Sequence, residues 1–431
     1  MPTRSALPIS RIANYIPIAA ATLFVVASLA TAGPLNPPAG PVTSTYKTLN
    51  EIEPRIAISA TNTPGDADSV YRITQPGSYY LTGNITDIPA GKSVKQLTHY
   101  KDIRDELFAA SGQDFEDLAL RTFHFQYEKN AFYRQYCNII GTDASAVHQL
   151  QQIPFLPIGF FKSKEIKSAA FEPEVIFESS GTTGSVNSKH FIKDIGLYEE
   201  SFLKAFEIFY GDIHKYCVIG LLPSYLERQH SSLVWMVNEL IKQTGHPLSG
   251  FYLYDHEKLR QVLLQNETAA QPTLLIGVTY ALLDLFQQFP LQLKHTIIME
   301  TGGMKGRKEE LTRSAIHEQL MKQSGLAAIH SEYGMTELLS QAYSKNAGIF
   351  NCPPWMKVMV RAGDDPFDII LPEKINGSFT SGAINVVDLA NLNSCCFIAT
   401  DDMGKLYTDG SFEVLGRLDN SDIRGCGLML L

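Results

Sequence analysis

Small hydroxyl residues and glycines are concentrated at residues 178–185 (ESSGTTGS). The members of this cluster are Ser179, Ser180, Gly181, Thr182, Thr183 and Gly184. The glycines let backbone N–H groups approach an anion closely, and the hydroxyls add further donors. Such a loop suits a polyphosphate, although an ordinary turn explains an isolated cluster of this kind equally well. It is not a Walker loop, because no Gly-Lys-Ser/Thr follows it.

A second cluster, residues 331–337 (SEYGMTE), combines an aromatic ring, a glycine, a hydroxyl and a carboxylate. The face of Tyr333 could stack on a purine. The carboxylate of Glu337 could hold Mg²⁺, which prefers carboxylate and phosphate oxygens. The alternative for Glu337 is an acid at a helix N-terminus, where the helix dipole favours negative charge.

Both clusters fall at the ends of expected strands. From residue 95 onward, short β-rich runs alternate with longer helical patterns, which predicts an α/β fold with mainly parallel sheets flanked by helices. Ligands bind beyond the carboxyl ends of strands in such sheets, so polar loops there indicate one shared pocket. The expected strands are 174–177, 217–222, 273–278, 296–299 and 327–330. The expected helices are 94–111, 114–136, 197–209, 231–244, 282–289 and 308–324. The expected loops are 178–185, 223–225, 300–306 and 331–337.

Composition limits the class of protein. The chain has 431 residues, of which 45% are hydrophobic, and a formal net charge of −9. At roughly 150 residues per domain this length allows two or three folding units. The hydrophobic content excludes wholesale disorder. A net negative charge without a run of Lys or Arg argues against nucleic acid as a partner.

The first 94 residues have a different composition, with half of the 22 prolines and none of the six cysteines. Residues 1–32 contain two arginines, an apolar run at 18–30 and an Ala-Thr-Ala end, which predicts a secretory signal peptide. A buried N-terminal helix is the alternative. The run is too short to span a bilayer, so no integral membrane span is expected. Residues 33–94 are expected to form a linker and a short β fragment, with two strands around Pro76-Gly77. This fragment resembles the start of secreted β-helix proteins.

Taken together, the motifs resemble those of the ANL superfamily of adenylate-forming enzymes. Residues 179–184 resemble its phosphate loop, and residues 333–337 match its Y-G-x-T-E. Residues 400–402 (TDD) stand where the superfamily has T-G-D, and residues 416–419 (GRLD) where it has G-R-x-D. More specifically, residues 95–431 resemble the LuxE-type acyl-protein synthetases, through residues 177–184, 330–337 and 416–426. The resemblance implies an ANL-type large N-terminal domain with a small β subdomain, without the ANL C-terminal domain, after an extra, mostly irregular N-terminal segment.

The resemblance also implies roles in binding ATP. Residues 179–184 would cradle the phosphates, and Tyr333 would lie against adenine beside Gly334. Thr336 would meet the α-phosphate and Glu337 would bind Mg²⁺. Asp402 and Arg417 would hold the ribose hydroxyls, with Asp401 as the alternative to Asp402.

Two further loops receive roles from the same resemblance. Gly302 and Gly303 would line the nucleotide pocket, and Lys305 could offer its charge to the phosphoryl transition state. A Pro-Lys that often closes the phosphate loop is missing, and Lys189 is a possible substitute.

Cys426 is the expected acyl carrier. A thiolate is nucleophilic and its thioester stays reactive, and flanking glycines leave this side chain open to approach. A buried structural cysteine is the alternative. By the resemblance, the enzyme would use ATP and Mg²⁺ to activate a fatty or other carboxylic acid as acyl-AMP, hold the acyl group on cysteine and pass it to a partner reductase. The alternatives are an acyl- or aryl-CoA ligase-like enzyme and a secreted, non-enzymatic surface protein.

The two segments imply different compartments. ATP and free thiols are typical of the cytoplasm, whereas a functional signal peptide would direct export. A fusion of a secreted protein's start with a cytoplasmic enzyme is the hypothesis that reconciles them.

Overall fold

The computed structural model describes residues 55–57, 69–72, 78–80, 93–95, 100–109, 114–179, 186–223, 230–302, 311–372 and 378–418. The chain divides into the units Met1–Arg55 and Ile56–Leu431, and the features below, apart from Arg55 itself, belong to the second. Several predictions lie outside the described residues: the signal peptide at 1–32, Ser180, Gly181, Thr182, Thr183, Gly184, Gly303, Lys305 and Cys426. The domain boundary expected at residue 94 stays a prediction.

Four short strands come first in the described part of the chain. β1 (Arg55–Ala57) pairs with β3 (Ser78–Tyr80), and β2 (Ser69–Arg72) pairs in parallel with β4 (Ser93–Lys95). The two strands expected around Pro76-Gly77 therefore form as β2 and β3, but each pairs with a different partner. β4 replaces the start of the helix expected at 94–111, and that helix is α2 (Tyr100–Glu106).

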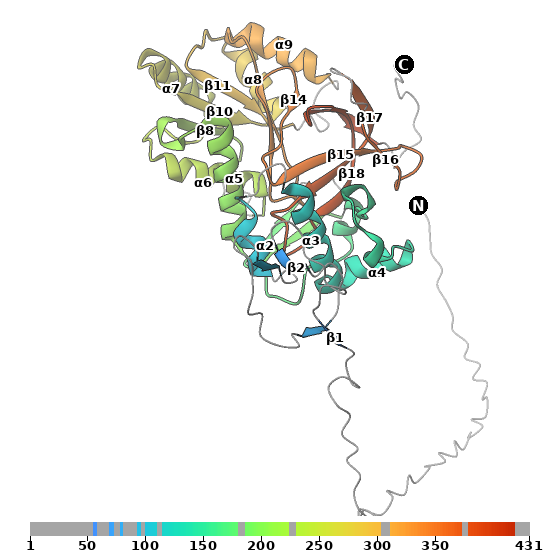
Figure 1. Ribbon diagram of the computed structural model, residues 1–431. Coiled ribbons are helices and arrows are strands. Elements are labelled where there is room, and N and C mark those ends of the chain that lie inside the picture. Colours follow the sequence, from blue (N-terminus) through green and yellow to red (C-terminus); the bar gives the residue numbers. More distant parts are fainter. Residues whose placement is uncertain are drawn as a thin grey trace, which may run out of the picture. The chain divides into compact units, whose positions relative to one another are not determined.

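A mainly parallel sheet carries the first set of candidate loops (Figure 1). Within the described residues its order is β13-β12-β11-β10-β8-β9, and β13 alone in this sheet runs antiparallel to its neighbour. Its strands are β8 (Cys217–Leu221), β9 (Gly250–Phe251), β10 (Thr273–Gly277), β11 (Thr296–Glu300), β12 (His330–Tyr333) and β13 (Ala342–Ser344). Every residue of β8 and β10 is buried, as expected for apolar strands covered on both faces.

Helices cover both faces of this sheet because alternate strand residues point in opposite directions. Val218 of β8 belongs to a core that includes residues of α5 and α6. Ile219, the next residue, belongs to a core with residues of α7, α8 and α9. The helices are α5 (Ile195–Tyr210), α6 (Ser232–Thr244), α7 (His256–Thr268), α8 (Thr279–Gln288) and α9 (Arg313–Ser324).

A second, antiparallel sheet carries the later motifs. Its order is β14-β19-β18-β17-β15-β16, with β5 joined in parallel to β18. Its strands are β5 (Leu156–Pro157), β14 (Ile349–Phe350), β15 (Met356–Arg361), β16 (Ile369–Ile370), β17 (Phe379–Asp388), β18 (Phe397–Tyr407) and β19 (Phe412–Arg417). The α/β class is thus confirmed, while this sheet departs from the mainly parallel arrangement that the sequence predicted.

Two helices pack on the antiparallel sheet, α3 (Phe115–Lys129) and α4 (Ala131–Ile139). Phe123 of α3 and Tyr133 of α4 both contact the ring of Phe397 in β18. Gln126 of α3 is buried, donates to the carbonyl of Asn391 and accepts from the N–H of Cys396. Helix α3 therefore supports the connection between β17 and β18.

The strand expected at 174–177 does not join the parallel sheet. It forms β6 (Val175–Glu178), which pairs antiparallel with β7 (Lys189–Ile192). The Ser/Thr/Gly loop therefore connects the strands of a hairpin, and its expected position at the end of a parallel strand is wrong. A four-residue β-rich run contains no signal for the strand with which it pairs.

Other element boundaries also differ from the sequence prediction. The helix expected at 114–136 is divided at Asn130, which caps α4 by accepting the N–H of Tyr133. Helix α9 begins at Arg313 rather than at 308, because Thr312 caps it through the N–H of Ala315. The strand expected at 327–330 is β12, so residues 331–333 lie in the strand and not in a loop. The short 3₁₀ helices are Ala144–Ala146, Leu150–Gln152, Ile158–Lys162 and Ile213–Lys215.

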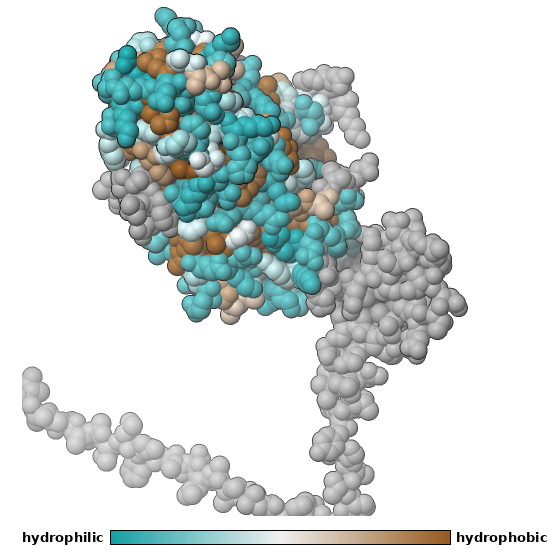
Figure 2. All heavy atoms as spheres, turned by 90° about the vertical axis from the view of Figure 1, so that its left-hand side faces the viewer, coloured by the Kyte–Doolittle hydropathy of each residue, from teal (hydrophilic) through white to brown (hydrophobic). Residues whose placement is uncertain are grey.

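Hydrophilic residues cover most of the face shown in Figure 2, and hydrophobic residues lie between them in smaller patches. In the part of the chain that the structure describes, no helix has the length and apolar character needed to cross a membrane.

Candidate active site

The loops after β11 and β12 leave the parallel sheet at the same edge. Glu300, the last residue of β11, lies opposite Ser331 of β12. Because the two strands are parallel, Gly302 and Gly334 follow their carboxyl ends on the same side of the sheet. The sheet thereby places two of the predicted loops next to each other.

Tyr333 joins this edge to the antiparallel sheet. Its hydroxyl donates to Oδ2 of Asp402 at 2.9 Å, and Nε of Arg417 lies 3.4 Å from Oδ1 of the same carboxylate. Burial raises the pKa of Asp402, and hydrogen bonding to Tyr333 and the charge of Arg417 partly offset this rise. Asp401 is exposed, so Asp402 is the aspartate that links Tyr333 with Arg417. Three predicted nucleotide contacts, from β12, β18 and β19, therefore form one connected group.

The ring of Tyr333 is held by aromatic neighbours. It lies 5.9 Å from the ring of Phe350 and 5.4 Å from that of Phe412, measured between centroids. Phe350 and Phe412 stack on each other at 5.3 Å. This packing fixes the direction in which the hydroxyl of Tyr333 points toward Asp402.

The base of the Ser/Thr/Gly hairpin is attached to the loop after β12. The N–H of Ser188 donates to Oγ of Ser179, and the N–H of Ser179 donates to the carbonyl of Ser188. His190 follows in β7, and its Nδ1 lies 2.8 Å from the carbonyl oxygen of Thr336. The described end of the candidate phosphate loop therefore lies beside the predicted Thr336 and Glu337.

Glu337 lies in a turn that follows β12, so the alternative of a helix N-terminal acid is wrong. Its side chain is buried, and burial raises the pKa of its carboxyl group, while a hydrogen bond with Ser188 acts in the opposite direction. Among the described residues no cluster of three or more His, Cys, Asp or Glu side chains could hold a metal ion. A single buried carboxylate fits a Mg²⁺ ion that takes its other ligands from phosphate and water.

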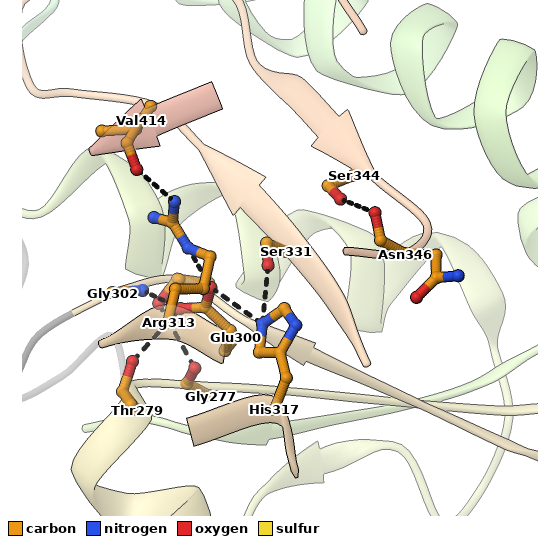
Figure 3. A network of polar contacts seen from close by, with 11 residues as sticks. Gly277, Thr279, Glu300, Gly302, Arg313, His317, Ser331, Ser344, Asn346 and Val414 are labelled. Atoms are coloured by element: carbon orange, nitrogen blue, oxygen red, sulfur yellow. Dashed lines mark hydrogen bonds and ion pairs between the residues drawn. The ribbon is translucent and has the colours of Figure 1, made fainter. Parts of the chain in front are cut away.

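Gly302 is fixed by a buried carboxylate that the sequence analysis did not single out (Figure 3). Gly302 has a left-handed backbone, with φ of +74°, and its N–H donates to Oε2 of Glu300 at 2.7 Å. Thr279 donates to the same oxygen at 3.1 Å. Nε of Arg313 lies 3.1 Å from Oε1, and Nε2 of His317 lies 3.6 Å from it. Burial acts to raise the pKa of Glu300, but hydrogen bonds from His317, Ser331 and the Gly302 N–H together with the charge of Arg313 lower this pKa to about 2.

Arg313 extends this network to the second sheet. Its Nη1 donates to the carbonyl of Val414 in β19 at 2.9 Å, as Figure 3 shows. Its guanidinium lies 5.1 Å from the centre of the Phe350 ring, which in turn contacts Tyr333. The loop after β11 is therefore braced against the same aromatic cluster that holds Tyr333.

Residues near the hairpin have structural contacts. Lys189, the expected substitute for the missing lysine, is exposed and lies 3.7 Å from the carboxylate of Glu178. His230 accepts the N–H of Glu178 with its carbonyl, and its ring Nδ1 lies 3.1 Å from the carbonyl of Ile176. Both residues contact strand β6.

The described cysteines are Cys137, Cys217, Cys352, Cys395 and Cys396, and none of these five forms a disulfide. Cys352 is half-buried and the others are buried. Burial raises the pKa of Cys137 and of Cys352 to about 12. Cys395 and Cys396 lie in the core, directly before strand β18. A raised pKa disfavours the thiolate that acyl transfer requires.

The fold is that of the ANL adenylate-forming enzymes. No family model matches the sequence. The solved structure of a 2-hydroxyisobutyryl-CoA ligase, in the postadenylation state with an acyl-adenylate, superposes with a TM-score of 0.52 at 10% identity, over 75% of this chain and 72% of that chain. The fold class expected from the sequence is thereby confirmed.

Within this class, the chain is similar to the LuxE-type enzymes. It is 25% identical over 373 residues to the long-chain-fatty-acid–luciferin-component ligase of Aliivibrio fischeri, covering 78% of this chain and 95% of the relative. It is 24% identical over 340 residues to the enzyme of the same name from Vibrio harveyi, covering 73% of this chain and 86% of that relative. The resemblance to the acyl-protein synthetases is confirmed, and so is the prediction of an enzyme of the ligase class.

Proposed function

We propose that this chain activates a long-chain fatty acid with ATP as acyl-AMP, binds the acyl group to Cys426 and passes it to a partner protein such as an acyl reductase. The observation that carries the proposal is the convergence of separate motifs on residues 333–337. Tyr333 meets Asp402 and, through it, Arg417, while Thr336 meets the hairpin that carries the Ser/Thr/Gly loop. The fatty-acid substrate follows the names of the two relatives.

In this proposal each group of residues binds one part of ATP. Ser179, Ser180, Gly181, Thr182, Thr183 and Gly184 cradle the phosphates, as glycine- and hydroxyl-rich loops do. Asp402 and Arg417 hold the ribose hydroxyls, and the edge formed by Tyr333 and Gly334 contacts adenine. Gly302 and Gly303 line the pocket on the side of β11.

The first half-reaction joins the acid to the α-phosphorus. A carboxylate oxygen of the fatty acid attacks the α-phosphorus, the new P–O bond forms, and the bond to the β-phosphate oxygen breaks to release pyrophosphate. Thr336 donates to the α-phosphate, and Lys305 offers positive charge to the equatorial oxygens. Glu337 would hold Mg²⁺, which would supply positive charge for the phosphate oxygens.

The second half-reaction transfers the acyl group to sulfur. The thiolate of Cys426 attacks the carbonyl carbon of acyl-AMP, a C–S bond forms, and AMP leaves with the electron pair of the broken C–O bond. The burial of the described cysteines supports Cys426 as the acceptor, since raised thiol pKa values disfavour nucleophilic attack. Catalysis of this kind fits the cytoplasm, where ATP is available and thiols stay reduced.

ATP–pyrophosphate exchange tests the first half-reaction. Fatty acids from octanoate to stearate are supplied one at a time, with and without Mg²⁺. We expect exchange that depends on both the acid and Mg²⁺, and a rise in the KM for ATP of roughly tenfold or more in Asp402→Asn, which removes a charged hydrogen-bond partner. Absence of exchange with every acid would overturn the proposal and favour the non-enzymatic alternative.

Intact-mass spectrometry tests the second half-reaction. After incubation with acid, ATP and Mg²⁺, we expect one acyl adduct on the wild-type protein. Cys426→Ala should lose the adduct and retain pyrophosphate exchange, whereas the matched variant Cys352→Ala should keep both. Formation of acyl-CoA on addition of coenzyme A, without an adduct, would support the CoA ligase alternative instead.

A further inference from the structure

Two successive carbonyl groups of the loop after β12 are held by side chains from other parts of the chain. The carbonyl of Thr336 faces Nδ1 of His190 at 2.8 Å. The carbonyl of Glu337 accepts a hydrogen bond from Nδ2 of Asn391 at 2.7 Å. His190 and Asn391 also contact each other, with Nε2 lying 3.0 Å from Oδ1.

The hydrogen-bonding capacity of these groups fixes their orientation. A carbonyl oxygen only accepts, so Nδ1 of His190 is the donor to Thr336 and Nδ2 of Asn391 is the donor to Glu337. The amide oxygen of Asn391 must then face His190. Burial lowers the pKa of His190 to about 4, while the contacts with Thr336 and Asn391 act in the opposite direction, because both ring nitrogens face oxygen atoms.

Both side chains are themselves immobilised. His190 is 1% exposed, and its ring meets the ring of Phe161 edge-on at 5.8 Å. Asn391 is fully buried, and its backbone carbonyl accepts from Gln126. A side chain that is enclosed in this way holds its partner in one position rather than following it.

The last residue of β17 fixes the next residues of the loop. Oδ2 of Asp388 accepts the N–H groups of Leu339 and Ser340, at 2.7 and 3.0 Å. Burial raises the pKa of Asp388, and these hydrogen bonds lower it. The segment from Thr336 to Ser340 is thus hydrogen-bonded to β7, to the end of β17 and to the connection that follows β17.

We propose that His190 and Asn391 form a clamp that positions Thr336 and Glu337 relative to the Ser/Thr/Gly hairpin. The inference rests on the proposed function and deepens it: both residues act through the loop that contacts the α-phosphate and Mg²⁺. Because β7 belongs to the hairpin, the clamp sets the separation between the residues that cradle the phosphates and the residues that act on them. Its residues are positioning residues, since they contact the loop and not the reacting atoms.

Pyrophosphate exchange of three variants tests the clamp. His190→Leu removes the donor to Thr336, and Asn391→Ala removes the donor to Glu337. We expect each to lower kcat roughly tenfold to a hundredfold, because a misplaced reacting group has that effect, with the KM for the fatty acid within about twofold. His190→Asn places an amide N–H near the position of Nδ1, and its kcat should be about tenfold higher than that of His190→Leu.

The matched control is Asn266→Ala. Asn266 is also buried, and its Nδ2 donates to Oγ1 of Thr273 at the other end of the parallel sheet's core. This variant should lower the melting temperature as Asn391→Ala does and leave kcat unchanged. An equal effect of both variants on kcat would show that lost stability, and not positioning, explains the result, and would overturn the proposal.

Hydrogen exchange gives a readout that needs no activity. In His190→Leu, the amides of residues 338–340 should exchange at least about tenfold faster, while those of β10 keep the wild-type rate. Unchanged exchange in residues 338–340 would overturn the clamp even if the wild-type enzyme is active. The wild-type protein could also lack pyrophosphate exchange while His190→Leu still accelerates hydrogen exchange. That result would support the clamp and refute the proposed function alone.

Discussion

Replacing Glu332 with glutamine should change how the stability of this protein depends on pH. Glu332 lies in β12 next to Tyr333 and is buried. Burial and the nearby charge of Glu300 raise the pKa of Glu332 to about 8. Among the ion pairs of the described residues, Glu300 is paired with Arg313 and Glu332 is in none. The two carboxyl groups therefore differ in charge near pH 7: Glu300 is ionised and Glu332 is protonated.

The sign follows from proton binding in the two states. In the unfolded chain Glu332 loses its proton near its ordinary pKa of 4.5, whereas in the folded protein it keeps the proton up to about pH 8. The unfolded state therefore binds fewer protons throughout this window, and the free energy of unfolding falls as pH rises. Each pH unit costs about 1.4 kcal/mol, so the wild-type protein should lose about 3 kcal/mol between pH 5.5 and 8 from this group.

Urea unfolding at pH 5.5 and pH 8 measures the effect. Glutamine has nearly the same shape and no titration, so the free energy of unfolding of Glu332→Gln relative to wild type should increase by about 3 kcal/mol between these pH values. Glu172→Gln, in which an exposed carboxylate is lost, is the control for the change in net charge. A stability difference for Glu332→Gln that is the same at both pH values would refute the reasoning.

Three further substitutions test the packing around the site. Glu300→Gln should destabilise by about 3 kcal/mol at pH 7, because it leaves the guanidinium of Arg313 without its carboxylate. The stability difference between Glu300→Gln and wild type should become smaller as pH falls from 4.5 toward 2. In this window Glu300 stays ionised in the folded protein and is protonated in the unfolded chain. Urea unfolding at pH 3 measures the difference. Trp355→Ala should lower the free energy of unfolding by about 3–5 kcal/mol in thermal melts, since the indole is fully buried and donates to Ser201. Gly404→Ala should lower the free energy of unfolding by about 1–3 kcal/mol and raise the KM for ATP. The new Cβ would lie 2.5 Å from the carbonyl oxygen of Glu413 and separate the strands that carry Asp402 and Arg417. A KM for ATP equal to that of wild type would contradict this.

The parts of the fold that could be predicted are those with a strong local signal. The apolar runs that became β8, β10 and β11 are continuous, and the caps Asp194 and Ser231 start α5 and α6 near the predicted residues. The pairing of strands is not local. The sequence therefore placed β6 in the wrong sheet and did not indicate how large the antiparallel sheet is.

The same distinction applies to the candidate site. Motif residues such as Tyr333 and Asp402 could be singled out because their spacing is distinctive, and the structure brings these two together. His190 and Asn391 belong to no motif and lie 201 positions apart, so only the folded chain reveals their contact. Glu300 could have been suspected, because an acid at the end of an apolar strand requires a partner, but nothing in the sequence identifies Arg313 as that partner.

The bonds from Gln126 to the β17–β18 connection have a consequence for biosynthesis. Helix α3 leaves the ribosome early, while its partners Asn391 and Cys396 are made 265 and 270 positions later. Contacts this distant in sequence form last, so a nascent chain has its early helices long before it has a competent catalytic centre. Under the proposed function, a partly translated chain therefore lacks the assembled site that acid activation needs, and activity would begin only when translation of the domain is nearly complete.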